Sequence, residues 1–468
     1  MVDLKVITTT GAGTVLKETV VAELRGSLRG ELLCPSDASP DGYDEARSIW
    51  NAMFDKRPAL IVRCAGVSDI ISAVNFARLH SIPVAVRGGG HNVSGSGACD
   101  DGLLLDMSRL KSVRVDPVSR TARAEPGLTW GEFDRETQAF GLATTGGICS
   151  ETGIAGVTLG GGYGWLMRKY GLALDNLVSV DVVGADGQLR TAGATENAAL
   201  FFGLRGTHSN FGVVTSLEYR LHPVGPMVLA GMVLHPLEKA GEVLRFYREY
   251  TAQAPEEMSA WAALLTSPDG HPLVAILACY IGPSELGEQV VRPLKEFGPP
   301  LADMIQPMPY VKAQSLMDES FPHGRHNYWK SNLLRELSDH AIDTLVAGFS
   351  RVTSPYSSVL IEHLGGAVSR VGKEETAFDQ RDAPYDLVIM PMWTDPAESE
   401  QHIRWADELW SAMEPFSSGG VYVNYLGNEG EARIKSAYVT NYERLVALKT
   451  KYDPMNLFRF NQNIKPTV

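Results

Sequence analysis

The stretch Arg87-Gly-Gly-Gly-His91-Asn92 comes directly after Pro83-Val-Ala-Val-Arg87, a short apolar run that predicts a buried strand. Glycine has no Cβ and adopts positive φ at little cost, so a glycine-rich turn lets the backbone approach a phosphate or a flat ring closely. In α/β folds, ligands bind where a strand runs into such a turn. The stretch therefore predicts a ligand-binding loop that carries one nucleophile, the imidazole of His91. A tight turn around a buried histidine is the alternative.

A second glycine loop, Thr144-Thr-Gly-Gly-Ile-Cys149-Ser-Glu-Thr-Gly153-Ile-Ala-Gly156, carries a second possible nucleophile. The Cys149 thiolate would be strongly nucleophilic where positive surroundings lower its pKa, although a lone cysteine is more often a small buried apolar residue. A third loop, Leu159-Gly-Gly-Gly-Tyr-Gly164, contains too many glycines for a helix interior or a regular strand. Three such loops predict a large anionic cofactor with a reactive ring.

Several well-known site patterns are missing from the sequence. It contains no G-x-G-x-x-G after a first strand, which argues against a Rossmann dinucleotide site and an NAD-dependent enzyme. It also lacks G-x-S-x-G, H-E-x-x-H and the P-loop pattern, so hydrolase, zinc-protease and P-loop readings have no residues to rest on. The five cysteines are irregularly spaced and form no C-x-x-C pair. We therefore expect neither a metal site nor a disulfide framework.

Length and charge limit the possible classes of protein. At 468 residues the chain exceeds the usual size of one hydrophobic core, so we expect two domains. Its 44% hydrophobic and 21% charged residues are typical of a soluble globular protein, and its net charge of −13 disfavours binding to nucleic acid or anionic membranes. The N-terminus lacks a signal-peptide pattern, and no run of about 18 apolar residues occurs. We expect a cytoplasmic protein that is a monomer or a homodimer.

The pattern of apolar residues changes near Pro226. Between about Gly30 and that point, helical and strand patterns alternate, and Ser68 has the chemistry of a helix N-cap. After it, strand patterns such as 274–279 and 359–363 occur among helical stretches around 283–297, 335–350 and 398–413, which predict an antiparallel sheet covered by helices. We expect the tail to return to the first domain, and residues 1–25 to be an extension outside it.

These motifs resemble those of the berberine-bridge, or vanillyl-alcohol-oxidase-like, family of flavoproteins. In that family a histidine in R-(S/G)-G-G-H is linked to the 8-methyl carbon of FAD, and His91 matches it. Bicovalent members also have a cysteine in G-G-x-C-x-x-x-G linked to flavin C6, and Gly146-Gly-Ile-Cys149-Ser-Glu-Thr-Gly153 matches that pattern. The resemblance therefore implies covalently attached FAD, with an 8α-N-histidyl bond at His91 and a 6-S-cysteinyl bond at Cys149.

The resemblance also implies the fold and further cofactor contacts. The expected protein is α+β, with an FAD-binding domain of the PCMH type at 28–225 and a substrate-binding domain on a helix-covered antiparallel sheet at 226–419. The C-terminal segment, 420–468, is expected to return to the FAD-binding domain. Besides His91 and Cys149, the implied cofactor-binding residues are Arg87, Gly88, Gly89, Gly90, Asn92, Ser94, Gly147, Gly153, Gly156, Gly160, Gly161, Val213, Asn461 and Asn463.

One segment departs from the family pattern. Where the family commonly has a glycine run before Asn-Phe-Gly, this chain has Arg205-Gly-Thr-His-Ser-Asn210. The side chains of Thr207, His208 and Ser209 would obstruct a very close approach of the backbone to a ligand. We therefore assign no cofactor contacts to these three residues.

Three residues are candidates for the base that takes a proton from the substrate. Tyr425 in Val421-Tyr-Val-Asn-Tyr425 and Tyr163 match tyrosines near the active site of plant relatives, and Glu362 interrupts an apolar strand. A free tyrosine has a pKa of about 10 and needs a charged neighbour to act as a base at pH 7. Core packing of the two tyrosines, and an edge position for Glu362, are the alternatives. The aromatic segment 321–330 either lines the substrate mouth or is a surface loop.

The resemblance implies an FAD-dependent oxidase. Such an enzyme transfers a hydride from an alcohol or amine carbon of a small molecule, here a secondary metabolite or sugar-like compound, to the flavin, and O₂ reoxidises the flavin to give hydrogen peroxide. Two alternatives stay open from the sequence. One is a flavin-dependent oxygenase or oxidative cyclase of natural-product biosynthesis, and the other is a flavin-bearing protein that binds drugs without turnover.

Overall fold

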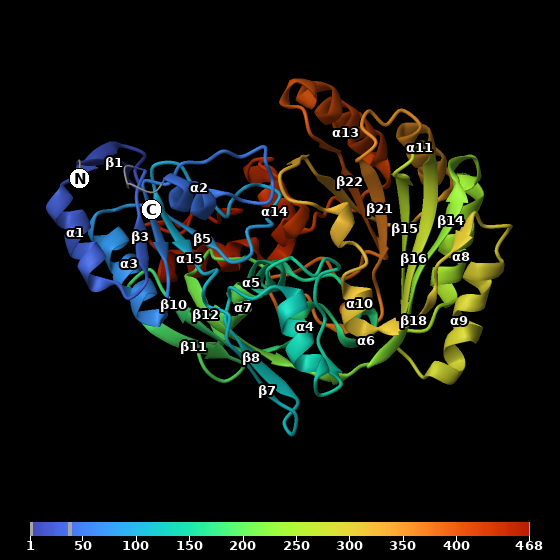
Figure 1. Cartoon of the computed structure of the whole chain (residues 1–468), viewed down its shortest axis with the longest axis horizontal. Helices are drawn as coiled ribbons and strands as arrows, with labels where there is room; N and C mark the ends of the chain where they lie inside the picture. The colour runs from blue at the N-terminus through green and yellow to red at the C-terminus, as the bar shows by residue number, and fades with distance from the viewer. Residues whose placement is uncertain (1–2, 36–39, 468) are drawn as a thin grey trace.

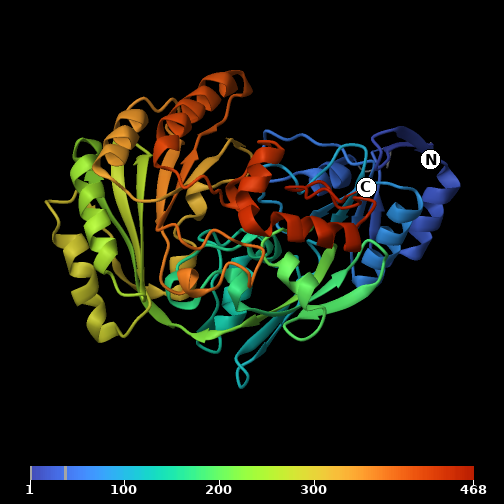
Figure 2. The same ribbon diagram turned by 180° about the vertical axis from the view of Figure 1, so that it is seen from behind.

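The computed structural model describes residues 3–35 and 40–467. The chain forms two halves that lie side by side (Figures 1 and 2). The N-terminal half, blue to green in Figure 1, holds a four-stranded and a five-stranded sheet, and the other half holds one eight-stranded sheet. The helices and mostly antiparallel strands confirm the predicted α+β class.

The four-stranded sheet positions the first glycine loop. Its strands follow the order β3 (Glu31–Leu33), β4 (Leu60–Arg63), β6 (Leu103–Asp106) and β5 (Val84–Arg87), and β4, β6 and β5 are parallel. Helix α3 (Val67–Leu79) follows β4. The N-cap of α3 is Gly66, so the expectation that Ser68 caps it is wrong: Ser68 already lies inside the first turn. Strand β5 ends at Arg87 and runs directly into Gly88.

The five-stranded sheet is antiparallel, and the second glycine loop lies between two helices that pack against it. Its order is β11 (Leu189–Gly193), β10 (Leu177–Val183), β12 (Val213–Arg220), β8 (Thr121–Ala124) and β7 (Val113–Asp116). Helix α4 (Trp130–Gln138) begins with a capping box between Thr129 and Glu132, which satisfies two free amides. The cysteine loop lies between α4 and α5 (Ile154–Gly160). Helix α7 spans Ala198–Leu204.

The eight-stranded sheet is buried on both faces. Its order is β17 (Ala302–Asp303), β14 (Met227–Pro236), β16 (Pro272–Tyr280), β15 (Met258–Thr266), β21 (Ser358–His363), β22 (Tyr385–Met390) and β20 (Lys330–Leu334), with β18 (Gln306–Pro309) also paired to β14. One face packs against helices α8 (Ala240–Gln253), α9 (Ser284–Glu296), α11 (Asp339–Phe349) and α13 (Ser399–Met413), which lie on the outer side in Figure 1.

The other face of this sheet packs against the N-terminal half. Side chains of β15 alternate between the two faces: Ala260 and Ala262 face the helices, whereas Trp261 and Ala263 pack with Tyr163 of the third glycine loop and with Trp165 directly after that loop. Burial on both sides explains why these strands appear in the sequence as continuous apolar runs rather than alternating ones.

The C-terminal segment crosses back to the N-terminal half. Helices α14 (Glu431–Tyr438) and α15 (Tyr442–Tyr452), red in Figure 1, contribute Tyr438 and Leu445 to the same core as the five-stranded sheet. Ile464 belongs to this core as well. The domain boundaries at 225 and 419 remain a prediction.

The described N-terminal residues, from Asp3 on, pack against the four-stranded sheet. The hairpin of β1 (Leu4–Ile7) and β2 (Gly13–Leu16), followed by α1 (Glu18–Ser27), buries apolar side chains in the core of the four-stranded sheet. Within the described ranges, none of the helices combines the length and apolar character needed to cross a bilayer. The remaining short elements are α2 (Pro40–Arg47), β9 (Leu142–Ala143), α6 (Met167–Tyr170), η1 (Ala173–Asn176), β13 (His222–Pro223), η2 (Leu237–Lys239), α10 (Tyr310–Gln314), η3 (Asp318–Ser320), β19 (His326–Asn327), α12 (Ala367–Arg370), β23 (Met392–Trp393), η4 (Pro396–Glu398), η5 (Glu414–Phe416), η6 (Val423–Tyr425) and η7 (Val439–Asn441).

The two glycine loops touch each other through their backbones. A Cβ added at Gly89 would lie 2.5 Å from the amide nitrogen of Gly153, and one added at Gly153 would lie 2.4 Å from the amide nitrogen of Gly89. Real Cβ atoms do not approach backbone this closely, so both positions require glycine.

Replacing Gly89 by alanine should therefore destabilise the protein by about 1–3 kcal/mol, because the loops must separate to admit the methyl group. The change is measured by thermal and denaturant unfolding of the purified variant. Gly26→Ala is the matched control: Gly26 lies in α1 with nothing within 4 Å of its Cβ position. That change should leave stability unchanged or raise it by about 0.5–1 kcal/mol. Equal stability of Gly89→Ala and wild type would contradict the account of the loop contact.

Candidate active site

A cavity extends along the contact between the two halves and is lined from both. It collects most of the residues that the sequence singled out: Arg87, Gly88, Gly89, Gly90, His91, Asn92, Gly147, Cys149, Gly153, Gly156, Tyr163, Tyr425 and Asn461. From the large sheet it also receives Trp261, Leu360 and Met390. Phe321 and Trp329 line it too, so segment 321–330 reaches the cavity.

Six of the predicted residues do not line this cavity: Ser94, Gly160, Gly161, Val213, Asn463 and Glu362. Ser94 is buried and donates a hydrogen bond to the side chain of Asn92, which does line it. Val213 is buried in the core of the four-stranded sheet, and its neighbour Val214 faces the cavity instead. Alternation along β12 accounts for this exchange, because successive side chains point to opposite faces.

His91 is held by aromatic rings. Its imidazole stacks on the indole of Trp50, with ring centroids 5.3 Å apart and planes inclined by 16°, and meets the ring of His323 edge-on at 5.0 Å. Burial and, secondarily, the nearby His323 lower the pKa of His91 to about 3. Its Nε2 is buried without a hydrogen-bond partner among the described residues. At neutral pH His91 is therefore an uncharged imidazole with a nitrogen available for another group.

Cys149 is a buried thiol beside a carboxylate. Burial, and then the charge of Asp318 and a hydrogen bond to it, raise the pKa of the thiol to about 12, although the Glu151 and Thr152 hydrogen bonds act in the opposite direction. Ser150, the residue after Cys149, fixes Asp318 in place. Its amide and its hydroxyl donate hydrogen bonds of 2.7 and 2.6 Å to the two carboxylate oxygens of Asp318. The cysteine is thus a protonated thiol and not a preformed thiolate.

Arg87 lines the cavity but is anchored elsewhere. Its guanidinium forms an ion pair of 2.8 Å with Asp106 and donates a hydrogen bond of 2.9 Å to the carbonyl of Ser48. These contacts tie the end of β5 to β6 and to the segment after α2. The glycine loop therefore starts from a rigid base.

Three tyrosines form an aromatic wall of the cavity, and one glutamate lies behind it. Tyr163 stacks on Tyr422, with centroids 3.8 Å apart, and Tyr425 meets both rings edge-on. The hydroxyl of Tyr425 donates a hydrogen bond of 2.8 Å to Glu362. Burial and then the charge of Glu362 raise the pKa of Tyr425 well above its ordinary value. The negative charge of Glu362 therefore opposes ionisation of the Tyr425 hydroxyl instead of easing it. Of these two groups, the Glu362 carboxylate is the better proton acceptor.

Glu362 is paired with a second buried acid. It lies opposite Asp386 in the antiparallel register of β21 and β22, and both residues have no exposed surface. Three of their four carboxyl oxygens have no hydrogen-bond partner among the described residues. Burial raises the pKa of both acids, and the charge of Asp386 raises that of Glu362 further, whereas Arg433 and the Tyr425 hydrogen bond act against the shift. Two adjacent carboxylates cannot both ionise easily, so the pair retains a proton at neutral pH.

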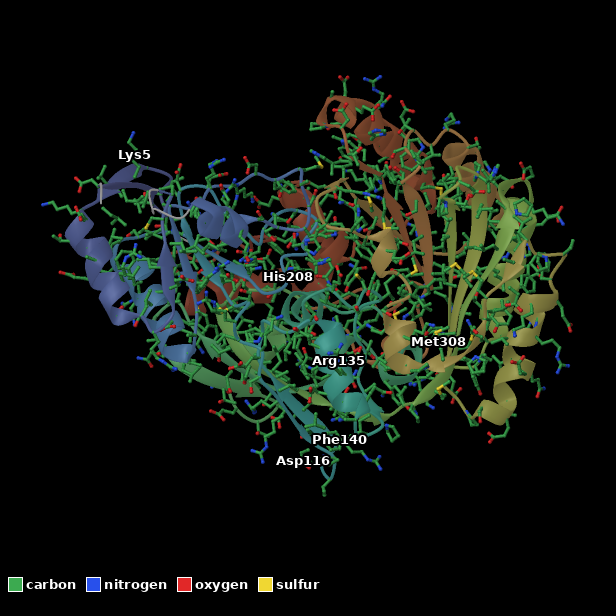
Figure 3. All side chains as sticks on the ribbon, in the orientation of Figure 1. Lys5, Asp116, Arg135, Phe140, His208 and Met308 are labelled. Atoms are coloured by element: carbon green, nitrogen blue, oxygen red, sulfur yellow. The ribbon has the colours of Figure 1, made fainter. Side chains whose placement is uncertain are left out.

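The segment that departs from the family pattern reaches the cavity after all. His208 and Ser209 both line it, while Thr207 is buried and binds the carbonyl of Gly203. His208 lies near the middle of the molecule (Figure 3), has a φ of 55°, and shares a hydrogen bond of 2.6 Å with Asn424. The side chains of these two residues thus form part of the cavity wall, while the expectation that they make no cofactor contacts stays a prediction.

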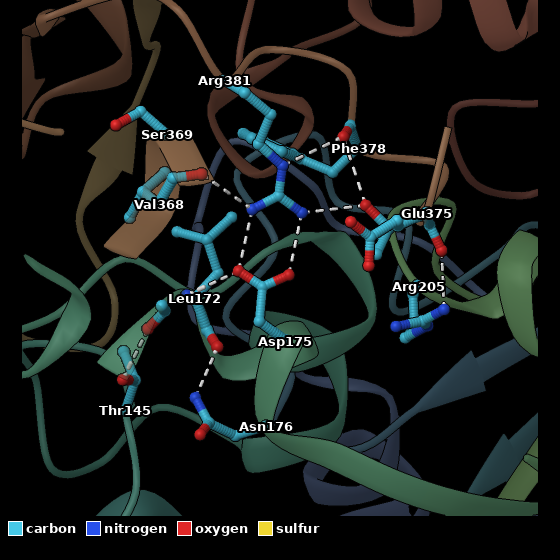
Figure 4. Close-up of polar contacts among 12 residues, drawn as sticks. Thr145, Leu172, Asp175, Asn176, Arg205, Val368, Ser369, Glu375, Phe378 and Arg381 are labelled. Carbon is cyan, nitrogen blue, oxygen red and sulfur yellow. Dashed lines mark hydrogen bonds and ion pairs between the residues drawn. The ribbon is translucent and has the colours of Figure 1, made fainter. Parts of the chain in front are cut away.

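An ion pair joins the two halves beside this wall (Figure 4). The guanidinium of Arg381, after β21, binds both oxygens of Asp175, in η1, at 2.7 and 2.8 Å. Both side chains are almost fully buried. Arg381 also lies over the ring of Phe378, which meets Tyr163 and Tyr422 edge-on. The ion pair therefore joins the two halves and, through Phe378, also supports the stacked rings of Tyr163 and Tyr422. Nothing in the sequence pairs residues this far apart.

The cavity fits a large polar cofactor. Six of its lining residues have a buried polar atom without a partner among the described residues, and these atoms are His91 Nε2, Tyr163 Oη, His208 Nδ1, Trp261 Nε1, Trp329 Nε1 and Asn461 Oδ1. Buried polar groups are normally hydrogen-bonded, so unpartnered ones around a cavity indicate a bound group. A Cβ added at Gly156 would meet nothing within 4 Å, which leaves open space above its backbone. FAD has the hydroxyl, amide and phosphate groups to satisfy such a wall.

Comparisons with known protein families agree with this site. Residues 58–193 match the family model described as FAD binding domain, and residues 421–465 match the one described as berberine and berberine like. The two matched ranges contain both nucleophiles and the Tyr422–Tyr425 wall.

Relatives match over nearly the whole chain. An FAD-linked oxidoreductase of Dictyostelium discoideum is 33% identical over 421 residues, which are 89% of this chain and 91% of the relative. The (R)-6-hydroxynicotine oxidase of Paenarthrobacter nicotinovorans is 28% identical over 94% of this chain and 97% of its own. The crystal structure of 6-hydroxy-D-nicotine oxidase from Arthrobacter nicotinovorans superposes with a TM-score of 0.87 over 94% of this chain and 99% of that one, at 28% identity.

The buried acid pair predicts how stability depends on pH. Unfolding releases the proton held by Glu362 and Asp386 wherever free carboxyls, with a pKa near 4, are ionised. The folded state then binds more protons than the unfolded state, so the free energy of unfolding falls as pH rises above about 4. Asp386→Asn reduces this term, because it removes one of the two acids and its charge while Glu362 stays buried. Its stability relative to wild type should increase with pH by up to about 1.4 kcal/mol per unit, measured by denaturant unfolding between pH 5 and 8. The exposed Glu336→Gln is the control, and parallel curves for Asp386→Asn and wild type would contradict the shared proton.

The ion pair in Figure 4 predicts a second effect on stability. Arg381→Met leaves the Asp175 carboxylate buried without its partner, which should cost about 3–5 kcal/mol. Adding Asp175→Asn to that variant should recover part of the loss, because the uncompensated charge is then removed. Unfolding of both single variants and the double variant measures the coupling. Strictly additive losses would show that the two side chains do not stabilise the fold as a pair.

Proposed function

This chain belongs to the berberine-bridge-like family of FAD-linked oxidoreductases, and we propose from its cavity that it is an oxidase whose FAD is covalently attached at both His91 and Cys149. The observation that supports this most directly is that two neutral nucleophiles from different glycine loops line one cavity. His91 would bond the 8-methyl carbon of FAD, and Cys149 would bond flavin C6. When bound, FAD accepts a hydride from the substrate and delivers the electrons to O₂.

The protein's own part in the reaction is to move a proton. Tyr425 faces the cavity and donates its hydroxyl proton to a hydrogen bond with Glu362. We infer that a substrate hydroxyl or amine gives its proton to Tyr425 while the Tyr425 proton moves to the Glu362 carboxylate, with the proton kept by the acid pair residing on Asp386. This route needs no free tyrosinate, which the buried surroundings disfavour. Tyr163 lies beside the same place with an unpartnered hydroxyl and would orient the substrate by a hydrogen bond.

The cavity wall indicates the kind of substrate. Trp261, Phe321 and Trp329, with the tyrosines, give the cavity a largely aromatic lining. Such a wall suits a small molecule with a flat or apolar body and one oxidisable alcohol or amine carbon. The nicotine oxidase among the relatives supports an amine as readily as an alcohol. We propose this class of substrate without a narrower choice.

The first experiment is the mass of the denatured protein. Wild type, His91→Ala and Cys149→Ala should each retain the mass of one FAD, because one link suffices to hold it. The double variant should show only polypeptide mass and should lose its flavin when denatured. Bare polypeptide mass in wild type would refute covalent attachment. Absence of flavin absorbance before denaturation would refute the FAD site itself.

A further inference from the structure

Both nucleophiles face the same segment of the other half. Cys149 adjoins Asp318, and His91 meets the ring of His323. Residues 318–323 comprise η3 and the loop after it, and they come from the half that carries the large sheet rather than from the glycine loops. We call this the attachment segment.

The attachment segment is fixed against both glycine loops. Asp318 receives the two hydrogen bonds of Ser150, the residue after Cys149. The carbonyl of Phe321 accepts a hydrogen bond of 2.9 Å from the indole of Trp50, and the amide of Gly324 donates one of 3.2 Å to the Trp50 carbonyl. Since Trp50 stacks on His91, the segment is tied to the surroundings of both nucleophiles. These hydrogen bonds hold the attachment segment beside His91 and Cys149.

Each nucleophile has a proton to lose. A thiol or imidazole N–H must be deprotonated as its new bond to carbon forms, and neither Cys149 nor His91 ionises by itself in this cavity. The Asp318 carboxylate lies beside the Cys149 thiol and is held there by Ser150, the residue after Cys149. The ring of His323, which meets the His91 ring edge-on, offers a nitrogen lone pair as the acceptor for His91. The side chain of His323 is 57% exposed and lies 3.9 Å from the Glu151 carboxylate, so an acquired proton can leave to solvent.

We propose that the attachment segment supplies the bases for covalent loading of FAD: Asp318 takes the proton of Cys149, and His323 takes the proton of His91. The inference rests on the covalent attachment proposed above. In each step an S–H or N–H bond and a C–H bond of the flavin are replaced by one S–C or N–C bond, and two protons leave. The two electrons pass to the flavin and from it to O₂, which becomes hydrogen peroxide.

The test separates the two links. In a His91→Ala background only the cysteine can attach FAD, and in a Cys149→Ala background only the histidine can. Apoprotein of each background is mixed with FAD and O₂, and the mass of the denatured protein is followed over time. Asp318→Asn should slow attachment about 100-fold in the first background and leave the second unchanged. His323→Gln should do the reverse. Glu319→Gln, an exposed neighbour in the same segment, should change neither rate.

Further measurements distinguish a base from a merely structural contact. Affinity for FAD before attachment, measured by flavin fluorescence, should stay near the parent value in each variant. Raising the pH to about 9 should restore much of the rate lost in Asp318→Asn, because hydroxide then removes the thiol proton. An unchanged rate at neutral pH would overturn the proposal for that residue. A loss that high pH does not restore would also overturn it and assign Asp318 a structural role.

Failure of the covalent proposal has a different signature. If neither background attaches FAD while the attachment segment is still wild type, the two-link proposal fails before the bases are tested. If both backgrounds attach FAD at the parent rate despite Asp318→Asn and His323→Gln, the links are real and the segment is not their base.

Discussion

The backbone contact between Gly89 and Gly153 is the constraint on which the site depends. No atom other than hydrogen fits between these two positions, since a Cβ on either would lie within 2.5 Å of the other's amide nitrogen. Because the loops meet this closely, a histidine two residues after Gly89 and a cysteine four residues before Gly153 line a single cavity. A methyl group between the loops would push them apart and move His91 and Cys149 away from each other within the cavity. Glycine is needed here for proximity, and not only for flexibility.

A second constraint joins this loop pair to the substrate side. The Arg381–Asp175 ion pair spans the contact between the halves, and its desolvation is offset by two direct bonds and by carbonyl and hydroxyl acceptors around the guanidinium (Figure 4). The same arginine packs on Phe378 and thereby on the tyrosine stack. Geometry at the flavin site is thus set by two rigid contacts, one of glycine backbones and one of buried charges.

Burial governs the chemistry of the titratable groups in this cavity. It keeps His91 uncharged, Cys149 protonated and Tyr425 un-ionised, and it leaves a proton on the Glu362–Asp386 pair. Neutral groups of this kind react only when a neighbour accepts their proton as they do so. This explains why acceptors lie beside them: Asp318 next to the thiol, and Glu362 next to the Tyr425 hydroxyl. Proton transfer in this cavity is therefore limited to a donor and an acceptor that already lie side by side.

The sequence by itself determined the local features of this protein. Apolar runs predicted β4 and β5, and the glycine loops with their motifs predicted His91 and Cys149 as cavity residues, because strand patterns and turns depend on neighbours along the chain. Tertiary structure alone decided the rest. Asp318 and Asp386 have no sequence signal. His323 falls in the segment 321–330, whose place the sequence left open, and His208 departs from the family pattern, yet all four lie at or beside the site. Their positions follow from strand register, which sets Asp386 opposite Glu362, and from packing between the halves, which brings Asp318 to Ser150. No local pattern encodes either.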